Sequence, residues 1–194
     1  MLNKNEISLL KKRIFGKIAK ENINAIVLFG SRARGDYTES SDYDINVLLS
    51  NNSKNIWKIN LDKQGLDFQI HVINASDLKK MKNDSHPFIY CTFRDGIPLY
   101  QKNQWFDRKR QQIIAMKPKK KISRDYFRQG LEQLRTSKWR ILQNKKFNLP
   151  MDHLEIEDGK VAANHIGFGL IMYHKKYPTS PHTIRDDIIK LDQK

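Results

Sequence analysis

The stretch of residues 29–49, FGSRARGDYTESSDYDINVLL, limits what this chain can fold into more than any other part of the sequence. An apolar run at residues 23–29 ends in the small turn Gly30-Ser31, and a second apolar run follows at residues 45–49. Apolar runs of this length between turn residues predict buried strands. The sequence therefore predicts a strand, a turn with a polar connection, and a second strand.

Two carboxylates precede the second apolar run. Side chains two residues apart on a strand point to the same face, so Asp42 and Asp44 are expected about 7 Å apart along the chain. Two neighbouring carboxylates repel each other unless a cation lies between them. Mg²⁺ is the usual cation for such an oxygen-only pair, and it completes its octahedron with water and substrate phosphates.

The Gly30-Ser31 turn supplies a candidate phosphate site. Glycine lets backbone N–H groups approach a phosphate closely, and a helix that starts there adds its positive end. A phosphate site beside a metal-binding carboxylate pair predicts phosphoryl or nucleotidyl transfer. Arg32 and Arg34 have two interpretations: surface charges on a short helix, or guanidinium groups of which one meets a triphosphate oxygen.

Gly30-Ser31, ten intervening residues and then Asp42-x-Asp44 resemble the signature of the DNA-polymerase-β-like nucleotidyltransferase superfamily. The fuller string GSRARGD…SDYD is similar to its small prokaryotic branch, the minimal nucleotidyltransferases. The resemblance implies an α/β nucleotidyltransferase fold with a mixed sheet. It also implies Mg²⁺ as cofactor and a nucleoside triphosphate, with ATP favoured, as substrate.

A third carboxylate enters through the same resemblance. Residues 66–73, LDFQIHVI, alternate apolar and polar side chains and predict a further strand. The superfamily carries its third acid at the start of the strand that follows the Asp-x-Asp strand, and Asp67 matches that position. Asp67 would then help bind Mg²⁺ and take the proton from the attacking hydroxyl. The alternative is an exposed Asp at a strand end.

The chain is expected to hold two domains. The aromatic stretch 88–93, an Asp-Gly turn and the sequence 97–100 resemble the way such domains end, which predicts a nucleotidyltransferase domain at 1–103 and a helical domain at 104–194. Long helical periodicities with short loops predict an all-α antiparallel bundle in the second part. This bundle is similar to the HEPN type or to the helical domain of kanamycin nucleotidyltransferase. The predicted buried side of its long helix comprises Tyr126, Phe127, Leu131, Leu134, Trp139, Ile141 and Leu142.

The net charge of +15 is concentrated in residues 101–146, which carry 15 Lys and Arg against 3 Asp and Glu. Surface helices usually mix charges of both signs, so this excess needs an explanation. Three remain open: general solubility, an acidic protein partner, and RNA. The lysines Lys117, Lys119, Lys120 and Lys121 form its densest cluster.

Two further observations exclude classes of protein. The single cysteine, Cys91, excludes a disulfide framework and a cysteine-rich zinc site. The N-terminus lacks the continuous apolar core of a signal peptide, and no stretch approaches the ~18 apolar residues of a membrane span. We therefore expect a cytoplasmic protein without membrane association.

The sequence as a whole predicts a Mg²⁺-dependent enzyme that transfers a nucleoside monophosphate to a hydroxyl group and releases pyrophosphate. The acceptor is a small molecule or a protein in the first hypothesis and RNA in the second. The non-enzymatic alternative is a degenerate transferase fold that grips a nucleic acid or a partner protein.

Overall fold

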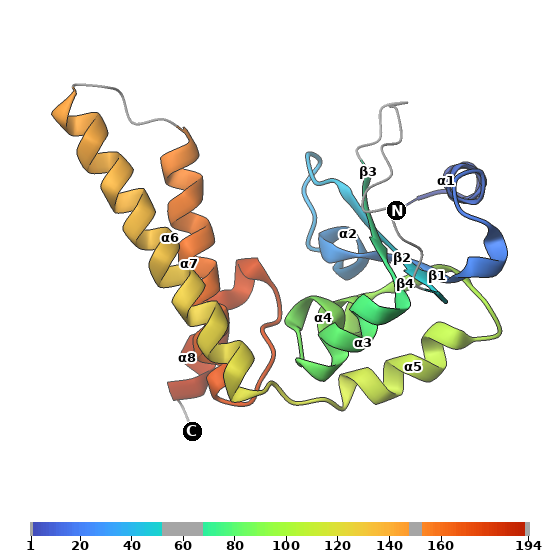
Figure 1. Ribbon diagram of the computed structural model, residues 1–194. Coiled ribbons are helices and arrows are strands. Elements are labelled where there is room, and N and C mark those ends of the chain that lie inside the picture. The colour runs from blue at the N-terminus through green and yellow to red at the C-terminus, as the bar shows by residue number, and fades with distance from the viewer. Residues whose placement is uncertain (1, 52–67, 148–152, 193–194) are drawn as a thin grey trace. The chain divides into compact units, whose positions relative to one another are not determined.

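The computed structural model describes residues 2–51, 68–147 and 153–192, and the chain divides into two compact units, Met1–Met116 and Lys117–Lys194. The first unit alternates helices and strands along the chain (Figure 1). Its elements are α1 (Lys4–Phe15), η1 (Lys20–Asn22), β1 (Ile23–Phe29), α2 (Gly30–Arg34), β2 (Tyr43–Leu49), β3 (Phe68–Ile73), α3 (Ala75–Asn83), α4 (Pro87–Asp95), β4 (Ile97–Gln101) and α5 (Trp105–Ile114).

The four strands form one mixed sheet in the order β3-β2-β1-β4. Strand β1 is antiparallel to both β2 and β4, whereas β2 and β3 are parallel. The predicted mixed sheet is thereby confirmed. The apolar runs that predicted the first two strands are β1 and β2, whose residues are buried almost throughout because both faces of the sheet are covered.

Each face of the sheet carries its own apolar cluster. On one face Leu10 and Ile14 of α1 pack with a cluster that includes Val47. On the other face Leu48 of β2 packs with Phe93 of α4 and with α5. Because side chains alternate along β2, Asp44 shares the face of Leu48, on the side of α4.

Helix α5 belongs to the first unit, so the division lies after Met116 and not near residue 103. Phe106 and Ile113 of α5 are fully buried in the cluster beneath α4. The Arg110 Nε atom also donates to the Phe93 carbonyl oxygen at 2.8 Å. The predicted boundary followed the last strand, but the apolar face of α5 is needed to close the core.

The second unit is helical, as predicted, and consists of α6 (Lys120–Lys146), α7 (His153–Tyr173), η2 (Pro181–Thr183) and α8 (Ile184–Asp192). Helices α6 and α7 lie side by side over most of their length (Figure 1). The buried positions of α6 are Ser123, Gly130 and Ser137. The prediction of an apolar buried side was therefore largely wrong, because Phe127, Leu131, Leu134, Trp139 and Leu142 are all exposed.

Small residues bring α6 and α7 close together. A Cβ atom on Gly130 would lie 2.6 Å from Ile166 Cγ1, and one on Gly169 would lie 2.9 Å from the Phe127 nitrogen. The Ser123 hydroxyl donates to the Gly169 carbonyl oxygen at 2.8 Å. Helices this close leave no room between them for leucine or tryptophan side chains, which accounts for their outward position.

Among the helices of the described residues, none is both long and apolar enough to cross a membrane.

Candidate active site

The strand-turn-helix connection from β1 into α2 brings the first candidate residues together. Gly30 has a φ of +74°, in the left-handed region that favours glycine. Phe29 pairs with Asp44 across the antiparallel strands, so Gly30 lies directly against that carboxylate. A Cβ atom on Gly30 would meet Asp44 Oδ2 at 2.0 Å. Only glycine fits here, and Ser31 follows in the first turn of α2.

Asp44 is the electrostatic centre of the site. Burial is the main cause that raises the pKa of its carboxyl group to about 6, and the nearby negative charge of Asp42 raises it further. The positive charge of Arg34 acts in the opposite direction. Asp42 lies immediately before β2 and is partly buried. The site thus holds two carboxylates close enough to repel each other, and a cation between them would relieve that repulsion.

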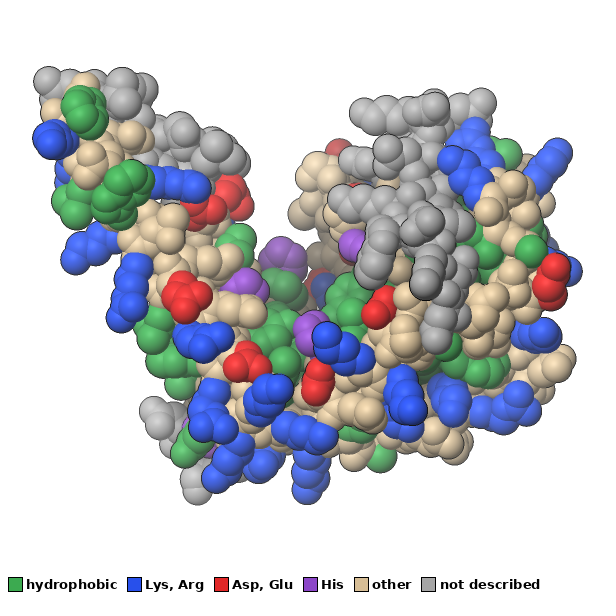
Figure 2. Space-filling view, viewed as in Figure 1, with side chains coloured by type: hydrophobic (Ala, Val, Ile, Leu, Met, Phe, Trp, Pro, Cys, Tyr) green, Lys and Arg blue, Asp and Glu red, His purple; other side chains and the backbone are tan. Residues whose placement is uncertain are grey.

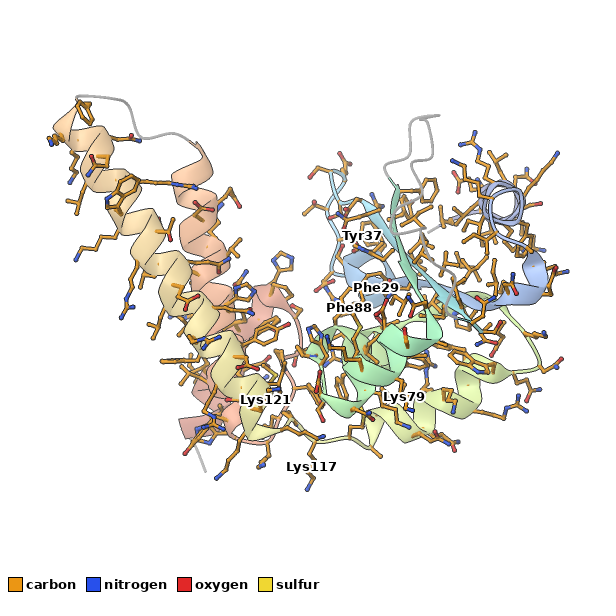
Figure 3. The ribbon with its side chains drawn as sticks, viewed as in Figure 1. Phe29, Tyr37, Lys79, Phe88, Lys117 and Lys121 are labelled. Atoms are coloured by element: carbon orange, nitrogen blue, oxygen red, sulfur yellow. The ribbon has the colours of Figure 1, made fainter. Side chains whose placement is uncertain are left out.

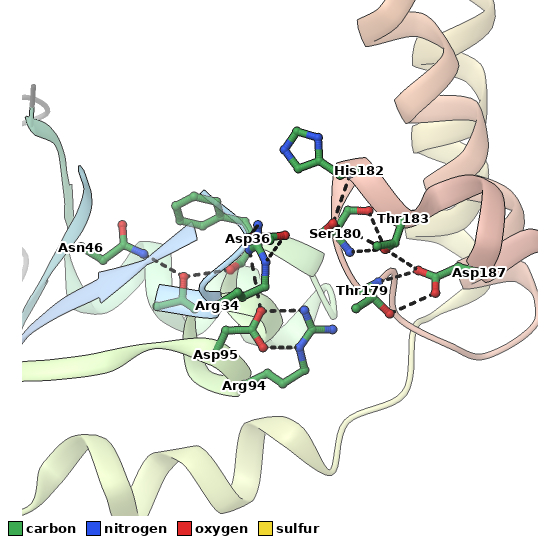
Figure 4. A network of polar contacts seen from close by, with 12 residues as sticks. Arg34, Asp36, Asn46, Arg94, Asp95, Thr179, Ser180, His182, Thr183 and Asp187 are labelled. Atoms are coloured by element: carbon green, nitrogen blue, oxygen red, sulfur yellow. Dashed lines mark hydrogen bonds and ion pairs between the residues drawn. The ribbon is translucent and has the colours of Figure 1, made fainter. Parts of the chain in front are cut away.

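The Arg34 guanidinium group belongs to a network of charges that joins α2 to α4 (Figure 4). Arg34 Nη2 lies 3.2 Å from Asp36 Oδ1, and Nη1 lies 3.9 Å from Asp95 Oδ2. Asp95 in turn accepts two hydrogen bonds of 2.6 Å from Arg94. Arg34 is therefore held near the carboxylate pair by acids on both sides.

Arg32 has a different role from Arg34. Its Nε and Nη2 atoms donate to the Ser41 carbonyl oxygen at 3.1 and 2.7 Å. The guanidinium carbon also lies 4.4 Å from the ring centroid of Tyr37 and 4.5 Å from that of Tyr43. These contacts hold the loop between α2 and β2 in place. Arg32 therefore helps to fix the position of the Asp42 carboxylate.

Below Asp44, on the same face of β2, a buried polar network links the sheet to α4. Asn46 Nδ2 donates to Thr92 Oγ1 at 2.7 Å, and that hydroxyl donates to the Phe88 carbonyl oxygen at 2.9 Å. Asn46 Oδ1 is buried and has no hydrogen-bond partner among the described residues. Asn46 was not predicted as a site residue, although its position two residues after Asp44 on one strand face was a usable signal.

Aromatic rings form an apolar wall beside this network. The rings of Phe29 and Phe88 meet edge to face, with centroids 5.3 Å apart (Figure 3). The ring of His71 lies 6.0 Å from Phe29 and 5.7 Å from Phe88. His71 pairs with Asn46 across the parallel strands β2 and β3, so β3 contributes to the same face.

Residues 12–105 match the family model described as polymerase beta, nucleotidyltransferase. This part of the chain belongs to the polymerase-β-like nucleotidyltransferase superfamily. The match covers the strand-turn-helix connection and both described carboxylates, so the nucleotidyltransferase domain contains the site built above.

Two curated proteins of Methanocaldococcus jannaschii, provisionally named as protein adenylyltransferases, share short segments with this chain. One is 45% identical over 38 residues, 20% of this chain and 38% of the relative. The other is 49% identical over 45 residues, 23% of this chain and 40% of the relative. The chain therefore spans about two fifths of the length of these relatives.

Solved structures resemble the chain more broadly at lower identity. A nucleotidyltransferase-like protein from Exiguobacterium sibiricum gives a TM-score of 0.46 at 12% identity, covering 93% of this chain and 63% of that protein. A chain from a toxin-antitoxin structure with AMP-PNP gives a TM-score of 0.38 at 17% identity, covering 72% and 98%.

The donor set of the nucleotidyltransferase domain suits a divalent cation. Carboxylate oxygens of Asp42 and Asp44 are the hard ligands that Mg²⁺ prefers, and Mg²⁺ is usually held by one or two carboxylates together with water and substrate phosphates. No cluster of three or more His, Cys, Asp or Glu occurs in the described part of the chain. Asp67, the predicted third acid, lies outside the described residues.

Proposed function

We propose that the chain is a Mg²⁺-dependent nucleotidyltransferase that moves a nucleoside monophosphate from a nucleoside triphosphate to a hydroxyl acceptor and releases pyrophosphate. The observation that carries this proposal is the contact between Gly30 and Asp44. A residue without a side chain meets a partly buried carboxylate whose pKa is raised to about 6 beside a second carboxylate. Such an arrangement places backbone without a side chain, which suits phosphate contact, beside carboxylates that need a positive charge.

Each residue has a definite part in this proposal. Asp42 and Asp44 would hold Mg²⁺, which when bound would supply positive charge to the phosphate oxygens. The backbone at Gly30 and the hydroxyl of Ser31 donate to the β- and γ-phosphates. The acceptor oxygen forms a bond to the α-phosphorus as the bond to the bridging oxygen breaks, and pyrophosphate carries away that electron pair. Asp67 takes the proton of the acceptor hydroxyl.

The two arginines divide their work in this proposal. Arg34 is held between Asp36 and Asp95. From there it keeps Asp44 closer to its ionised form and is available to a triphosphate oxygen. Arg32 is also a candidate for nucleotide contact. Its hydrogen bonds to the Ser41 carbonyl oxygen instead hold the loop that precedes Asp42. We assign it to positioning Asp42.

ATP is the favoured nucleotide, and a protein or small-molecule hydroxyl is the favoured acceptor. The names of the two Methanocaldococcus jannaschii relatives support adenylyl transfer to protein. RNA is the second candidate acceptor, and the observation in its favour is the excess of 15 basic over 3 acidic residues in residues 101–146. An acidic protein is the remaining candidate partner for that segment.

Transfer of label from the α-phosphate tests the proposal. The full chain, Mg²⁺ and α-labelled ATP are incubated with cell extract, and protein, RNA and small molecules are then separated. We expect label in one fraction, and its loss in Asp42→Asn and Asp44→Asn. Glu39→Gln is the matched control, since it removes an exposed negative charge from the same connection.

The outcomes separate the alternatives. Label in the protein, small-molecule or RNA fraction identifies the acceptor class. Nucleotide binding without label in any fraction, repeated with the other three triphosphates, would contradict transfer and support the degenerate binding module. Equal labelling by wild type and both Asp variants would contradict the role of the carboxylate pair.

A further inference from the structure

One third of the surface of α6 has an unusual composition. Because successive residues of a helix are about 100° apart, twelve residues of α6 project within an arc of roughly 120°. We call this arc the cationic–apolar face. It holds no polar neutral or acidic residue and consists of Lys120, Lys121, Arg124, Arg128, Arg135, Lys138, Lys145 and Lys146 with Phe127, Leu131, Trp139 and Leu142.

All twelve residues of the cationic–apolar face are exposed. The stripe that faces α7 is a different one, formed by Ser123, Gly130 and Ser137. The two acids of the helix, Asp125 and Glu132, project beyond the arc, and Glu132 Oε1 lies 3.9 Å from Nε of Arg128 at its edge. In Figure 2 blue and green side chains alternate along the left edge of the helical unit in this view, and Figure 3 labels Lys121 in the first turn of α6.

The density of charge on this face matches a polyphosphate chain. A helix of 27 residues is about 40 Å long, so eight cations give one positive charge every ~5 Å. Proteins that bind single-stranded nucleic acids combine such a line of cations with aromatic rings on which bases stack. Trp139 is 62% exposed, so its ring is accessible for stacking. Phe127 is 37% exposed and lies beside Gly169 of α7, so only part of its ring is accessible.

From these observations we infer that the cationic–apolar face of α6 binds single-stranded nucleic acid through its phosphates and bases. This inference does not rest on the proposed function, because α6 lies outside the nucleotidyltransferase domain. The face supplies cations for the backbone and separated rings for bases, without a set of groups that would read a particular sequence.

Other occupants fit the face less well. A partner helix needs a continuous apolar stripe, but Arg135 and Lys138 lie between Leu131 and Leu142, and their charges would be buried at such an interface. A second copy of this chain would place eight cations against eight cations. A helix that lies on a membrane separates its apolar face from its cations, whereas here both share one arc.

Fluorescence anisotropy tests the inference, with the full chain and a labelled single-stranded RNA of mixed sequence, about 20 nucleotides long. We expect binding that weakens steeply as salt rises. The triple variant Arg135→Gln, Lys138→Gln, Lys145→Gln should flatten the plot of log K against log salt by about two. Trp139→Ala should weaken binding about fivefold or more and leave the salt slope unchanged.

A matched control removes the same charge elsewhere. Lys4, Lys12 and Lys17 are exposed lysines in and just after α1, and their triple change to Gln should leave binding within about twofold of wild type. An equal loss in this control would overturn the inference, because net charge alone would then explain binding. Absence of RNA binding at low salt would also overturn it, whether or not the chain binds phosphatidylglycerol vesicles.

Discussion

At the scale of single residues, Asp44 is the residue on which the proposed chemistry most depends. Its carboxyl group lies against Gly30 on one side and feels the negative charge of Asp42 and the positive charge of Arg34. Burial is the first cause of its raised pKa. Ionised Asp44 therefore destabilises the folded, metal-free domain, which is the expected property of a residue that serves a ligand more than the fold.

The pKa of Asp44 predicts how stability depends on pH. A folded-state pKa near 6 against an ordinary value of 3.8 means that the destabilisation is present above pH 6 and absent below pH 4. With EDTA present, Asp44→Asn should raise the free energy of unfolding by about 1–2 kcal/mol at pH 8, a value reduced for solvent screening. The gain should vanish at pH 4. Urea titrations at both pH values measure it, and an equal effect at both would contradict the assigned cause.

The sequence predicted some of these residues and not others. The proximity of Gly30 to Asp44 and of Asp42 to Asp44 was predictable because spacing and strand alternation act over short range, while their roles and that of Ser31 stay predictions. The pairing of Arg34 with Asp95 was not predictable, because it joins helices far apart in sequence. Such contacts depend on how α2 and α4 meet, which no local pattern encodes.

At the scale of secondary structure, the turn from β1 into α2 depends on a glycine for two reasons at once. Gly30 needs both a positive φ and the absence of a side chain, because Asp44 occupies the space. Gly35, at the end of α2, also has a positive φ of +87°, but apart from its chain neighbours no described residue has an atom within 4 Å of an added Cβ. A substitution at Gly35 would therefore cause backbone strain alone, whereas the same substitution at Gly30 would cause strain and a clash with Asp44.

Gly30→Ala should therefore cost about 3 kcal/mol or more in the free energy of unfolding, because it adds a clash to the strain. Gly35→Ala should cost about 1 kcal/mol, from strain alone. Urea denaturation of both variants measures the difference. Equal losses would mean that Asp44 moves aside easily and that the close contact at Gly30 is not a constraint.

In the pair of helices α6 and α7, small residues allow two backbones to pack closely together. Periodicity located the apolar residues of α6, but it wrongly predicted that their stripe would be the side that meets α7. The close approach at Gly130 decides which side meets α7, since an added Cβ would lie 2.8 Å from the Ile166 nitrogen and 2.9 Å from the Ala162 carbonyl oxygen. The small residues at regular spacing in α6 could have predicted the side that meets α7, whereas a search for apolar residues could not.

Gly130→Ala should destabilise the helical unit by about 2–3 kcal/mol, because the two backbones must move apart. Gly159→Ala is the matched control in α7, where an added Cβ meets no described residue outside its own helix backbone within 4 Å. It should stabilise the unit by up to about 1 kcal/mol through helix propensity. Thermal melting followed by circular dichroism distinguishes the two, and a stabilised Gly130→Ala variant would contradict the packing described.

At the scale of the whole molecule, the chain combines two units of different character. Residues 2–51 and 68–116 contain the mixed sheet and the candidate site, while the helical unit carries the cationic–apolar face. The fold class was predictable from alternating strands and helices followed by helices alone. The boundary was not, because the sequence does not show that Phe106 and Ile113 of α5 complete the core.

The boundary predicts how fragments behave. A fragment of residues 1–116 should fold cooperatively, because it keeps α5 and the bond from Arg110 to the Phe93 carbonyl oxygen. A fragment of residues 1–103 should lose cooperative melting, since it exposes the cluster that α5 covers. Circular dichroism melts of both fragments test this. Equal stability of the two would show that α5 is dispensable for the first unit.

Calorimetric titration of nucleoside triphosphates into the full chain tests the central proposal most directly, namely that Asp42 and Asp44 bind a nucleotide through Mg²⁺ beside Gly30. We predict heat of binding for Mg²⁺-ATP or another triphosphate at millimolar concentration, and its loss with EDTA or in Asp42→Asn. Glu39→Gln should bind as wild type does. Absence of heat with all four ribonucleoside triphosphates, or binding that survives in EDTA and in Asp42→Asn, would contradict the account.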